Sequence, residues 1–141
     1  MLLSFVSKQK NLRKLEIFTV GNLERKFFDA LPKNNLEKLS ISMDEDISYA
    51  LSSFKNLKSL RCIVGNLTDQ FVKNLLNCEN LKKLHFNHIE KLSLTAEGEN
   101  SFEHFKNLEL LSFRRGIYSR EEKLDNILKA VAKCEKLNNL K

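Results

Sequence analysis

The stretch Leu81-Lys82-Lys83-Leu84-His85-Phe86 is one of five copies of a motif, Leu-x-x-Leu-x-(apolar), that recurs along the chain. The other complete copies are Leu12-Arg13-Lys14-Leu15-Glu16-Ile17, Leu36-Glu37-Lys38-Leu39-Ser40-Ile41, Leu57-Lys58-Ser59-Leu60-Arg61-Cys62 and Leu108-Glu109-Leu110-Leu111-Ser112-Phe113. A sixth copy, Leu137-Asn138-Asn139-Leu140, stops as the sequence stops. Alternating apolar residues are typical of a β-strand with one buried face, so each copy predicts a short strand.

Helices are predicted between the strands, because apolar residues also recur at fixed distances before the motif. The first leucines of successive copies are 24, 21, 24, 27 and 29 residues apart. In three of the units, the positions ten, six and three residues before the first leucine are apolar. They are Ile47, Leu51 and Phe54 before Leu57, Phe71, Leu75 and Cys78 before Leu81, and Ile127, Val131 and Cys134 before Leu137. These spacings place each trio on one helical face. Each unit is therefore predicted to run from helix through a tight turn to strand.

A repeat of this length and motif resembles the leucine-rich repeat, whose units stack because none can bury its apolar face alone. The resemblance implies an α/β solenoid of about five to six repeats, with a curved parallel sheet and helices on its convex side. Strands are expected at residues 12–17, 36–41, 57–62, 81–86 and 108–113, with Leu39 and Leu84 buried. The second and fifth helices should be the shortest or least regular, since Pro32 and Gly98 interrupt their patterns.

Capping residues mark the predicted helix starts. Thr68 and Asp69 precede a helix that should run to about Asn77, and Ser119-Arg120-Glu121-Glu122 forms a capping box before another. The stretch 44–46, Asp-Glu-Asp, precedes a third helix. Hydroxyl and carboxylate oxygens accept hydrogen bonds from the unpaired N–H groups of a first turn, which also favours negative charge. We therefore explain these acidic residues as caps and assign them no catalytic role.

The composition predicts a single domain that spans residues 1–141. With 42% apolar residues, a chain of 141 residues can bury a real core. We expect it to be a piece of a longer repeat array, because neither Leu2, Leu3 and Phe5 nor the unfinished sixth motif resembles a polar capping repeat. No apolar run is long enough for a membrane span or a signal peptide. An intracellular location, cytoplasmic or nuclear, is the simplest expectation.

No residue pattern indicates catalysis, a cofactor or a metal. The sequence has no Gly-rich phosphate loop, no G-x-S-x-G turn and no paired-histidine motif, so we expect no enzymatic activity. Cys62, Cys78 and Cys134 occupy apolar positions and are expected to be buried, unpaired thiols. Zinc ligation by Cys78, His85 and His88 is disfavoured, because the chain has no CxxC pair and His85 should point away from the core.

One subclass of the repeat is indicated by the run Leu67-Thr68-Asp69-Gln70-Phe71-Val72-Lys73-Asn74-Leu75-Leu76-Asn77-Cys78-Glu79-Asn80-Leu81-Lys82-Lys83-Leu84. It resembles the cysteine-containing, ribonuclease-inhibitor-like leucine-rich repeats that are associated with F-box proteins, and residues 128–137 echo it. The resemblance implies the substrate-recognition region of an F-box-type ubiquitin ligase, with any adaptor contact made by a region absent from this chain. Two alternatives are the ligand-sensing domain of an intracellular immune receptor and a basic scaffold associated with nucleic acid.

The predicted binding surface follows from strand alternation. If the motif leucines face the core, the residues between and beside them face the opposite, concave side of the sheet. The candidate partner-binding residues on that side are Lys14, Phe18, Lys38, Arg61, Ile63, Lys83, His85 and Arg114, with Asn87 at a flanking position. The net charge of +6 favours an acidic protein ligand. Nucleic acid is a weaker candidate because glutamates interrupt the basic residues, and the lysines could also simply solvate the sheet.

Overall fold

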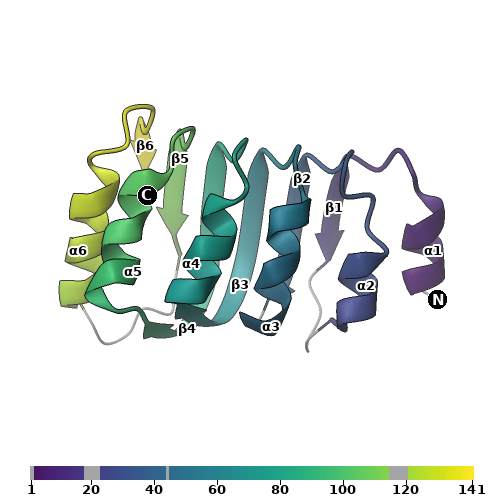
Figure 1. Ribbon diagram of the computed structural model, residues 1–141, viewed down its shortest axis with the longest axis horizontal. Helices are drawn as coiled ribbons and strands as arrows, with labels where there is room; N and C mark the ends of the chain where they lie inside the picture. The colour runs from purple at the N-terminus through teal and green to yellow at the C-terminus, as the bar shows by residue number, and fades with distance from the viewer. Residues whose placement is uncertain (1, 18–22, 44, 115–120) are drawn as a thin grey trace.

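The computed structural model describes residues 2–17, 23–43, 45–114 and 121–141, apart from the side chains of Glu45, Asp46 and Glu121. Helices and strands alternate along the chain (Figure 1). Their order is α1 (Leu2–Lys8), β1 (Lys14–Ile17), α2 (Arg25–Asp29), β2 (Lys38–Met43), α3 (Glu45–Ser48), the 3-10 helix η1 (Tyr49–Ser53), β3 (Ser59–Thr68), α4 (Asp69–Leu76), β4 (Lys83–Ser93), α5 (Ala96–Asn100), the 3-10 helix η2 (Ser101–His104), β5 (Leu110–Phe113), α6 (Glu121–Val131) and β6 (Asn139–Leu140).

The strands form one parallel sheet in which every neighbour in space is also the neighbour in sequence, from β1 to β6. Equivalent motif positions pair directly, so that Leu39 lies opposite Leu15 and Leu60. The predicted parallel α/β arrangement is confirmed. The strands start two residues later than predicted, because the first leucine of each motif belongs to the turn, where Leu57 and Leu108 are fully buried. The predicted ends at residues 62 and 86 are also wrong, because β3 continues to Thr68 and β4 to Ser93, and the two extensions pair with each other.

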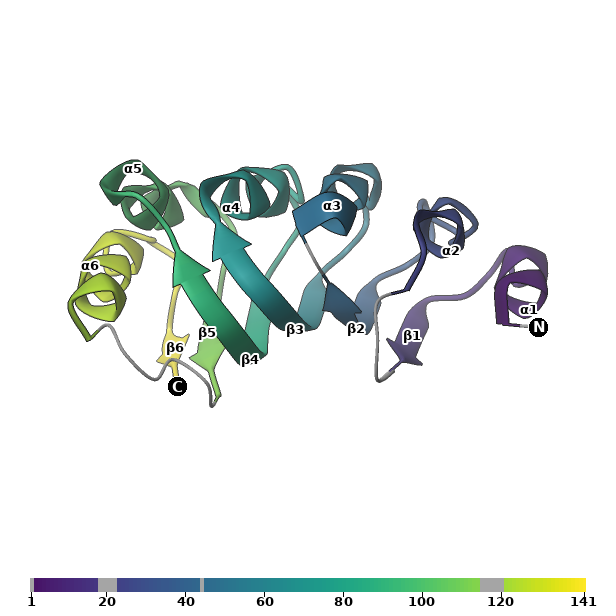
Figure 2. The same ribbon diagram turned by 90° about the horizontal axis from the view of Figure 1, so that it is seen from below.

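The core lies between the sheet and a single layer of helices. Figure 2 shows the helices along one side of the sheet and no helix on the other side. Leu39 and Leu84 are 2% and 0% exposed, as predicted, and the apolar trios of the helices pack against them. A sheet covered on one face only buries alternate residues and leaves the intervening ones accessible. We call the side of the sheet without helices the open face.

The sequence predicts the capping and the buried face of the helices more accurately than their lengths. Thr68 caps α4 by accepting a hydrogen bond from the N–H of Phe71, as predicted, and the helix ends at Leu76. Helices α2 and α5 are short, with 5 residues each, and α5 continues as a 3-10 helix, as expected for the second and fifth units. Among the described α-helices, however, α3 is shorter still, with 4 residues and its own 3-10 continuation, and this was not predicted. The predicted caps at Asp44 and Ser119 lie outside the described residues.

Candidate functional site

The open face carries a groove with a volume of about 560 Å³ across its first four strands. Five of the predicted partner-binding residues line it: Lys14, Lys38, Arg61, Lys83 and His85. Strand register brings them together, because Lys14 lies opposite Lys38 and Arg61 lies opposite His85. Between them, Ser40 is 4% exposed although it belongs to the open face. Its short side chain is covered by its longer neighbours, and this makes the floor of the groove.

The remaining candidates lie elsewhere. Ile63, half-buried on β3, and Arg114, exposed after β5, do not line the groove, and Phe18 lies outside the described residues. The flanking position on β4 differs from the prediction, because a register shift after Cys62 sets Ile63 opposite His88 instead of Asn87. The extra residue is a β-bulge, and its signal is the spacing of the buried residues: Cys62 and Val64 are two apart, Phe86 and Ile89 three apart.

Charges on the open face fall into a paired rim and an unpaired centre. Three lysines contact carboxylates on the same or a neighbouring unit: Lys14 with Glu16 at 3.1 Å, Lys58 with Glu37 at 3.3 Å and Lys82 with Glu109 at 2.9 Å. The hydrogen bond from Lys82 lowers the pKa of Glu109. Within the described part of the chain, no carboxylate lies within 4 Å of a side-chain nitrogen of Lys38, Arg61 or Lys83. The centre of the groove therefore keeps an unbalanced positive charge.

His85 reports this charge. Partial burial lowers its pKa below the ordinary value of 6.5, and the cations Arg61, Arg114, Lys141 and Lys83 lower it further. Desolvation disfavours the imidazolium form, and every charged group that bears on the ring is positive. At neutral pH His85 is therefore a neutral hydrogen-bonding group inside a cationic surround.

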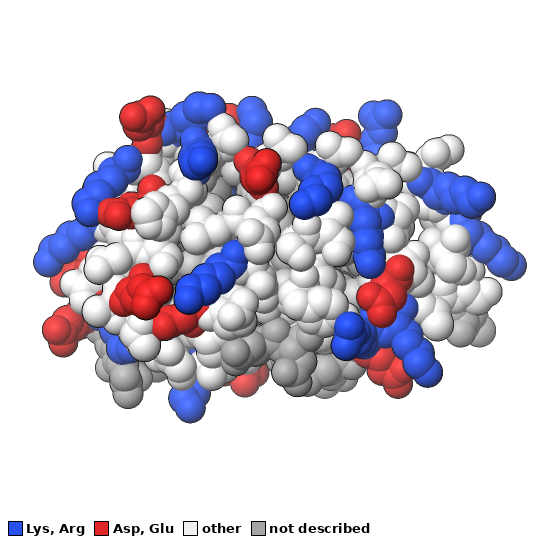
Figure 3. Space-filling model, in the orientation of Figure 1, with Lys and Arg blue, Asp and Glu red and all other residues white. Residues whose placement is uncertain are grey.

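The helix-covered face has a different electrostatic character. Figure 3 shows basic and acidic side chains intermixed over it. Several of them are paired across units, such as Lys73 with Glu97 at 3.6 Å and Lys123 with the buried Glu99 at 3.6 Å. Asn126 also donates to Glu99, over 2.8 Å. These contacts connect neighbouring helices.

Two of the cysteines do more than fill space. The Cys78 thiol lies 3.1 Å from the backbone carbonyl oxygen of Leu51, and the Cys134 thiol lies 3.2 Å from that of Phe102. Both carbonyls belong to the 3-10 helix of the preceding unit and already accept the backbone N–H of the residue that ends it, Phe54 or Phe105, so each thiol is a second donor to the same oxygen. The cysteines were predicted only as buried apolar residues, and their role as weak donors between units was missed.

A second connection between units was also missed. An asparagine immediately before the first motif leucine donates its side-chain amide to a backbone carbonyl in the turn of the preceding unit. The pairs are Asn35 with Lys10 at 2.6 Å, Asn56 with Asn34, Asn80 with Lys55 at 2.8 Å and Asn107 with Glu79 at 2.8 Å. The signal was present in the sequence as Asn-Leu-x-x-Leu, one residue upstream of the motif.

The described residues contain no cluster of three or more His, Cys, Asp or Glu side chains that could hold a metal ion. Cys78 is buried under the turn, whereas His85 lies on the open face, so the two do not meet. Among the same residues, no helix is long and apolar enough to cross a bilayer.

Solved structures similar to this chain share its fold. Actin-binding site 2 of leiomodin-1 matches with a TM-score of 0.61 and 13% identity, over 93% of this chain and 86% of that one. A leucine-rich-repeat protein of Leptospira interrogans matches with a TM-score of 0.55 and 16% identity, over 96% of this chain and 38% of that one. No protein-family model and no curated protein sequence matches. The chain has a leucine-rich-repeat fold and spans well under half of the Leptospira protein.

Proposed function

We propose that the chain is a protein-binding repeat module without enzymatic activity, whose open face receives an acidic segment of another protein. The observation that carries the proposal is the contrast within the groove: Lys14, Lys58 and Lys82 at the rim have carboxylate partners, whereas Lys38, Arg61 and Lys83 at the centre have none among the described residues. Unbalanced charge in a shallow groove steers an oppositely charged partner and fixes its register.

Two further facts support this proposal. The groove opens to solvent along the sheet, which suits an extended or helical segment better than a small substrate that must be enclosed. The structural neighbour from leiomodin-1 is itself named as an actin-binding site, so this fold serves protein binding in at least one similar chain.

The wider role is proposed on the sequence resemblance alone. The cysteine-containing repeat favours the substrate-recognition region of an F-box-type ubiquitin ligase, in an intracellular protein that is longer than this chain. An immune-receptor sensor domain is the alternative with the same fold. A nucleic-acid scaffold is less favoured, because His85 supplies the sole aromatic ring among the described residues that line the groove, and single strands bind best where several rings stack on bases.

The test is charge reversal with a matched control. The variant Lys38→Glu/Arg61→Glu/Lys83→Glu reverses the centre of the groove, and Lys26→Glu/Lys55→Glu/Lys129→Glu makes the same change in charge at exposed lysines away from the groove. Proteins captured from an extract by the wild type are identified and their association rates measured. We expect the groove variant to slow association of a cognate partner by about tenfold or more at low salt, and the control variant to change it little.

Circular dichroism of all three proteins verifies that they are folded. Equal loss of binding in the two variants would show a general dependence on net charge and would contradict the proposed surface. Unchanged binding in the groove variant would place the contact on the helices or the loops.

A further inference from the structure

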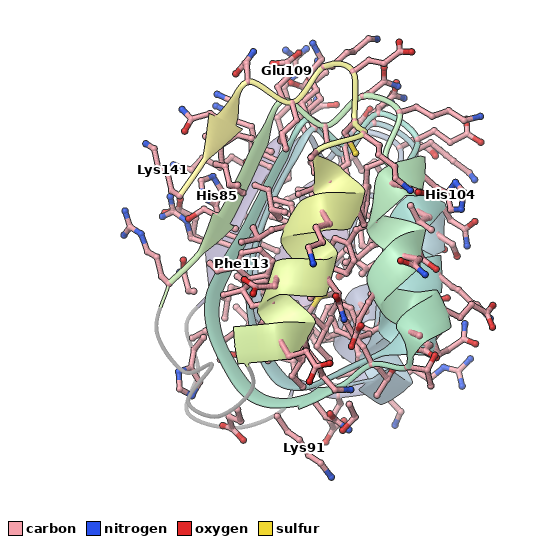
Figure 4. All side chains as sticks on the ribbon, turned by 90° about the vertical axis from the view of Figure 1, so that its left-hand side faces the viewer. His85, Lys91, His104, Glu109, Phe113 and Lys141 are labelled. Carbon is pink, nitrogen blue, oxygen red and sulfur yellow. The ribbon has the colours of Figure 1, made fainter. Side chains whose placement is uncertain are left out.

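One side of the groove continues into a cluster of cations that four neighbouring strands supply. Arg61 on β3 pairs in register with His85 on β4, and Lys83 lies two residues before His85. Arg114 follows β5 and donates its backbone N–H to the carbonyl oxygen of Phe86 at 2.7 Å. Lys141 follows β6, and its carbonyl oxygen accepts from the N–H of Phe113 at 2.8 Å. Figure 4 shows His85 and Lys141 on the side of the sheet away from the helices, and His104 on the helix side.

The cluster has donors but lacks acceptors. Arg61, Arg114, Lys141 and Lys83 are the charged groups that act on the His85 ring, and all are positive. No side-chain carboxylate lies within 4 Å of a side-chain nitrogen of these four residues in the described part of the chain. Ser112, the neighbour of His85 on β5, is 1% exposed and adds no charge. Adjacent strands are about 4.8 Å apart, so side chains from three of them can reach one small anion.

We propose that Arg61, Lys83, His85 and Arg114 bind a phosphate monoester, which a phosphorylated residue of the protein partner presents. The inference rests on the proposed function and names the chemistry that the groove selects. A phosphate monoester carries close to two negative charges and three acceptor oxygens. Guanidinium groups bind such oxygens in a forked geometry, and Lys and His add single donors. A side-chain carboxylate has one charge and two oxygens, so it would leave most of these donors unmatched.

Phosphate binding at this site should change the protonation of His85. In the unliganded protein partial burial, together with the surrounding cations, holds the imidazole neutral, with one N–H to donate. A bound dianion offsets those cations and favours the imidazolium form, which donates from both nitrogens. Phosphate binding is therefore coupled to uptake of a proton at His85, and the titration of this ring reports occupancy directly.

The experiment is an NMR titration of the histidine ring protons in the full chain, at constant ionic strength. The probes are inorganic phosphate, a short phosphoserine peptide and the same peptide with glutamate. We expect phosphate and phosphopeptide to raise the pKa of His85 and to leave the ring signals of His104, on the opposite side, in place at a fixed pH. Arg61→Gln/Lys83→Gln should weaken the binding of both probes by about tenfold or more, as expected for lost charge-assisted hydrogen bonds. Lys26→Gln/Lys91→Gln, on α2 and at the far end of β4, removes the same two charges away from the cluster and is the matched control.

An equal response to the glutamate peptide would overturn the phosphate proposal and leave an acidic-segment module standing. No response of His85 to any probe would also overturn it, while the charge-reversal experiment separately decides whether the groove binds proteins. A stronger response to single-stranded oligothymidylate than to the phosphopeptide would overturn it in favour of nucleic acid.

Discussion

At the scale of single residues, burial makes the thiols unreactive. It raises the pKa of Cys78 to about 12, and it also raises the pKa of Cys62 and Cys134. The thiolate is the nucleophile, so almost none is present at neutral pH. All three cysteines are buried, and none of them forms a disulfide.

We therefore predict that the native protein resists an aromatic disulfide reagent at about pH 8, where an ordinary thiol with a pKa of about 8.5 reacts readily. Three thiols should react once urea unfolds the chain. The absorbance of the released thiolate measures this. A thiol that reacts in the native state as fast as a small-molecule thiol would show that one of these sites opens without global unfolding.

His85 should make stability depend on pH in the mildly acidic range. Its pKa in the folded protein lies below the ordinary value of 6.5 that the unfolded chain keeps. As the pH falls, the unfolded state binds a proton first, so the contribution of His85 to the free energy of unfolding is complete above about pH 6.5 and is lost as the pH falls through the folded pKa.

Replacing His85 by a residue that does not titrate removes its part of the loss of stability at acidic pH. In urea denaturation, the free energy of unfolding of the wild type minus that of His85→Gln should be constant above about pH 7 and should decrease below about pH 6.5. Asn87→Gln serves as the control, since it changes a partly buried residue of the same strand without changing a titratable group. A difference that increases on acidification would mean that His85 is protonated favourably in the native state and would contradict its cationic surround.

At the scale of helices and strands, the junction of α4 and α5 shows how one unit caps the next. The Asp69 carboxylate, in the first turn of α4, accepts from the Thr95 N–H at 2.9 Å and from the Thr95 hydroxyl at 2.6 Å. Thr95 is the N-cap of α5 and accepts from the Gly98 N–H. A Cβ atom on Gly98 would stand 1.9 Å from Asp69 Oδ1, so Gly98 leaves the room that the carboxylate needs.

We predict a change of sign in a double-mutant cycle. Gly98→Ala alone should destabilise the protein by about 1–3 kcal/mol, because it displaces the Asp69 carboxylate. In an Asp69→Ala background the same change should stabilise it by up to about 1 kcal/mol, since alanine favours a helix over glycine. Urea denaturation of the four proteins gives the coupling. Additive effects would mean that Asp69 and Gly98 do not constrain each other.

The sequence predicts those features of the fold that depend on residues within one repeat unit, and it does not predict those that depend on contacts between units. The leucine period and the helical trios predict the elements, and Thr68 predicts its cap, because each pattern lies within one unit. The bulge that pairs Ile63 with His88 and the partners of Asn80 and Asp69 join residues of different units. Such contacts depend on the register between units, which varies with the length of each return segment.

The same distinction applies to the groove. Alternation correctly places Lys38, Arg61 and Lys83 on the open face, because it is a property of each strand alone. Which lysines stay unpaired depends on the acidic neighbour across the sheet. Lys58 meets Glu37 and Lys82 meets Glu109 from adjacent units, whereas Lys38 and Lys83 both flank Ser59. The electrostatic contrast is therefore visible only in the folded chain.

At the scale of the whole molecule, stacking in sequence order separates the two faces by role. Each strand pairs with its neighbours in sequence, so the described helices all lie along one side of the sheet and leave the other side without a helical layer. The helix side buries the core, and some of its charges pair between units, such as Lys73 with Glu97 and Lys123 with Glu99. The open face holds the groove and the unpaired cations. This division is the physical basis for the central claim that the open face is the binding surface.

Photo-crosslinking tests that claim most directly. A photoreactive amino acid is placed either at Ser59, between Lys38 and Lys83 in the groove, or at Lys129, exposed on α6. We expect a discrete adduct of higher mass from the Ser59 position after irradiation in cells, and its loss when Arg61→Glu/Lys83→Glu is added. The Lys129 position should give none. A discrete adduct from Lys129 together with none from Ser59 would contradict the account, because it would place the partner on the helices.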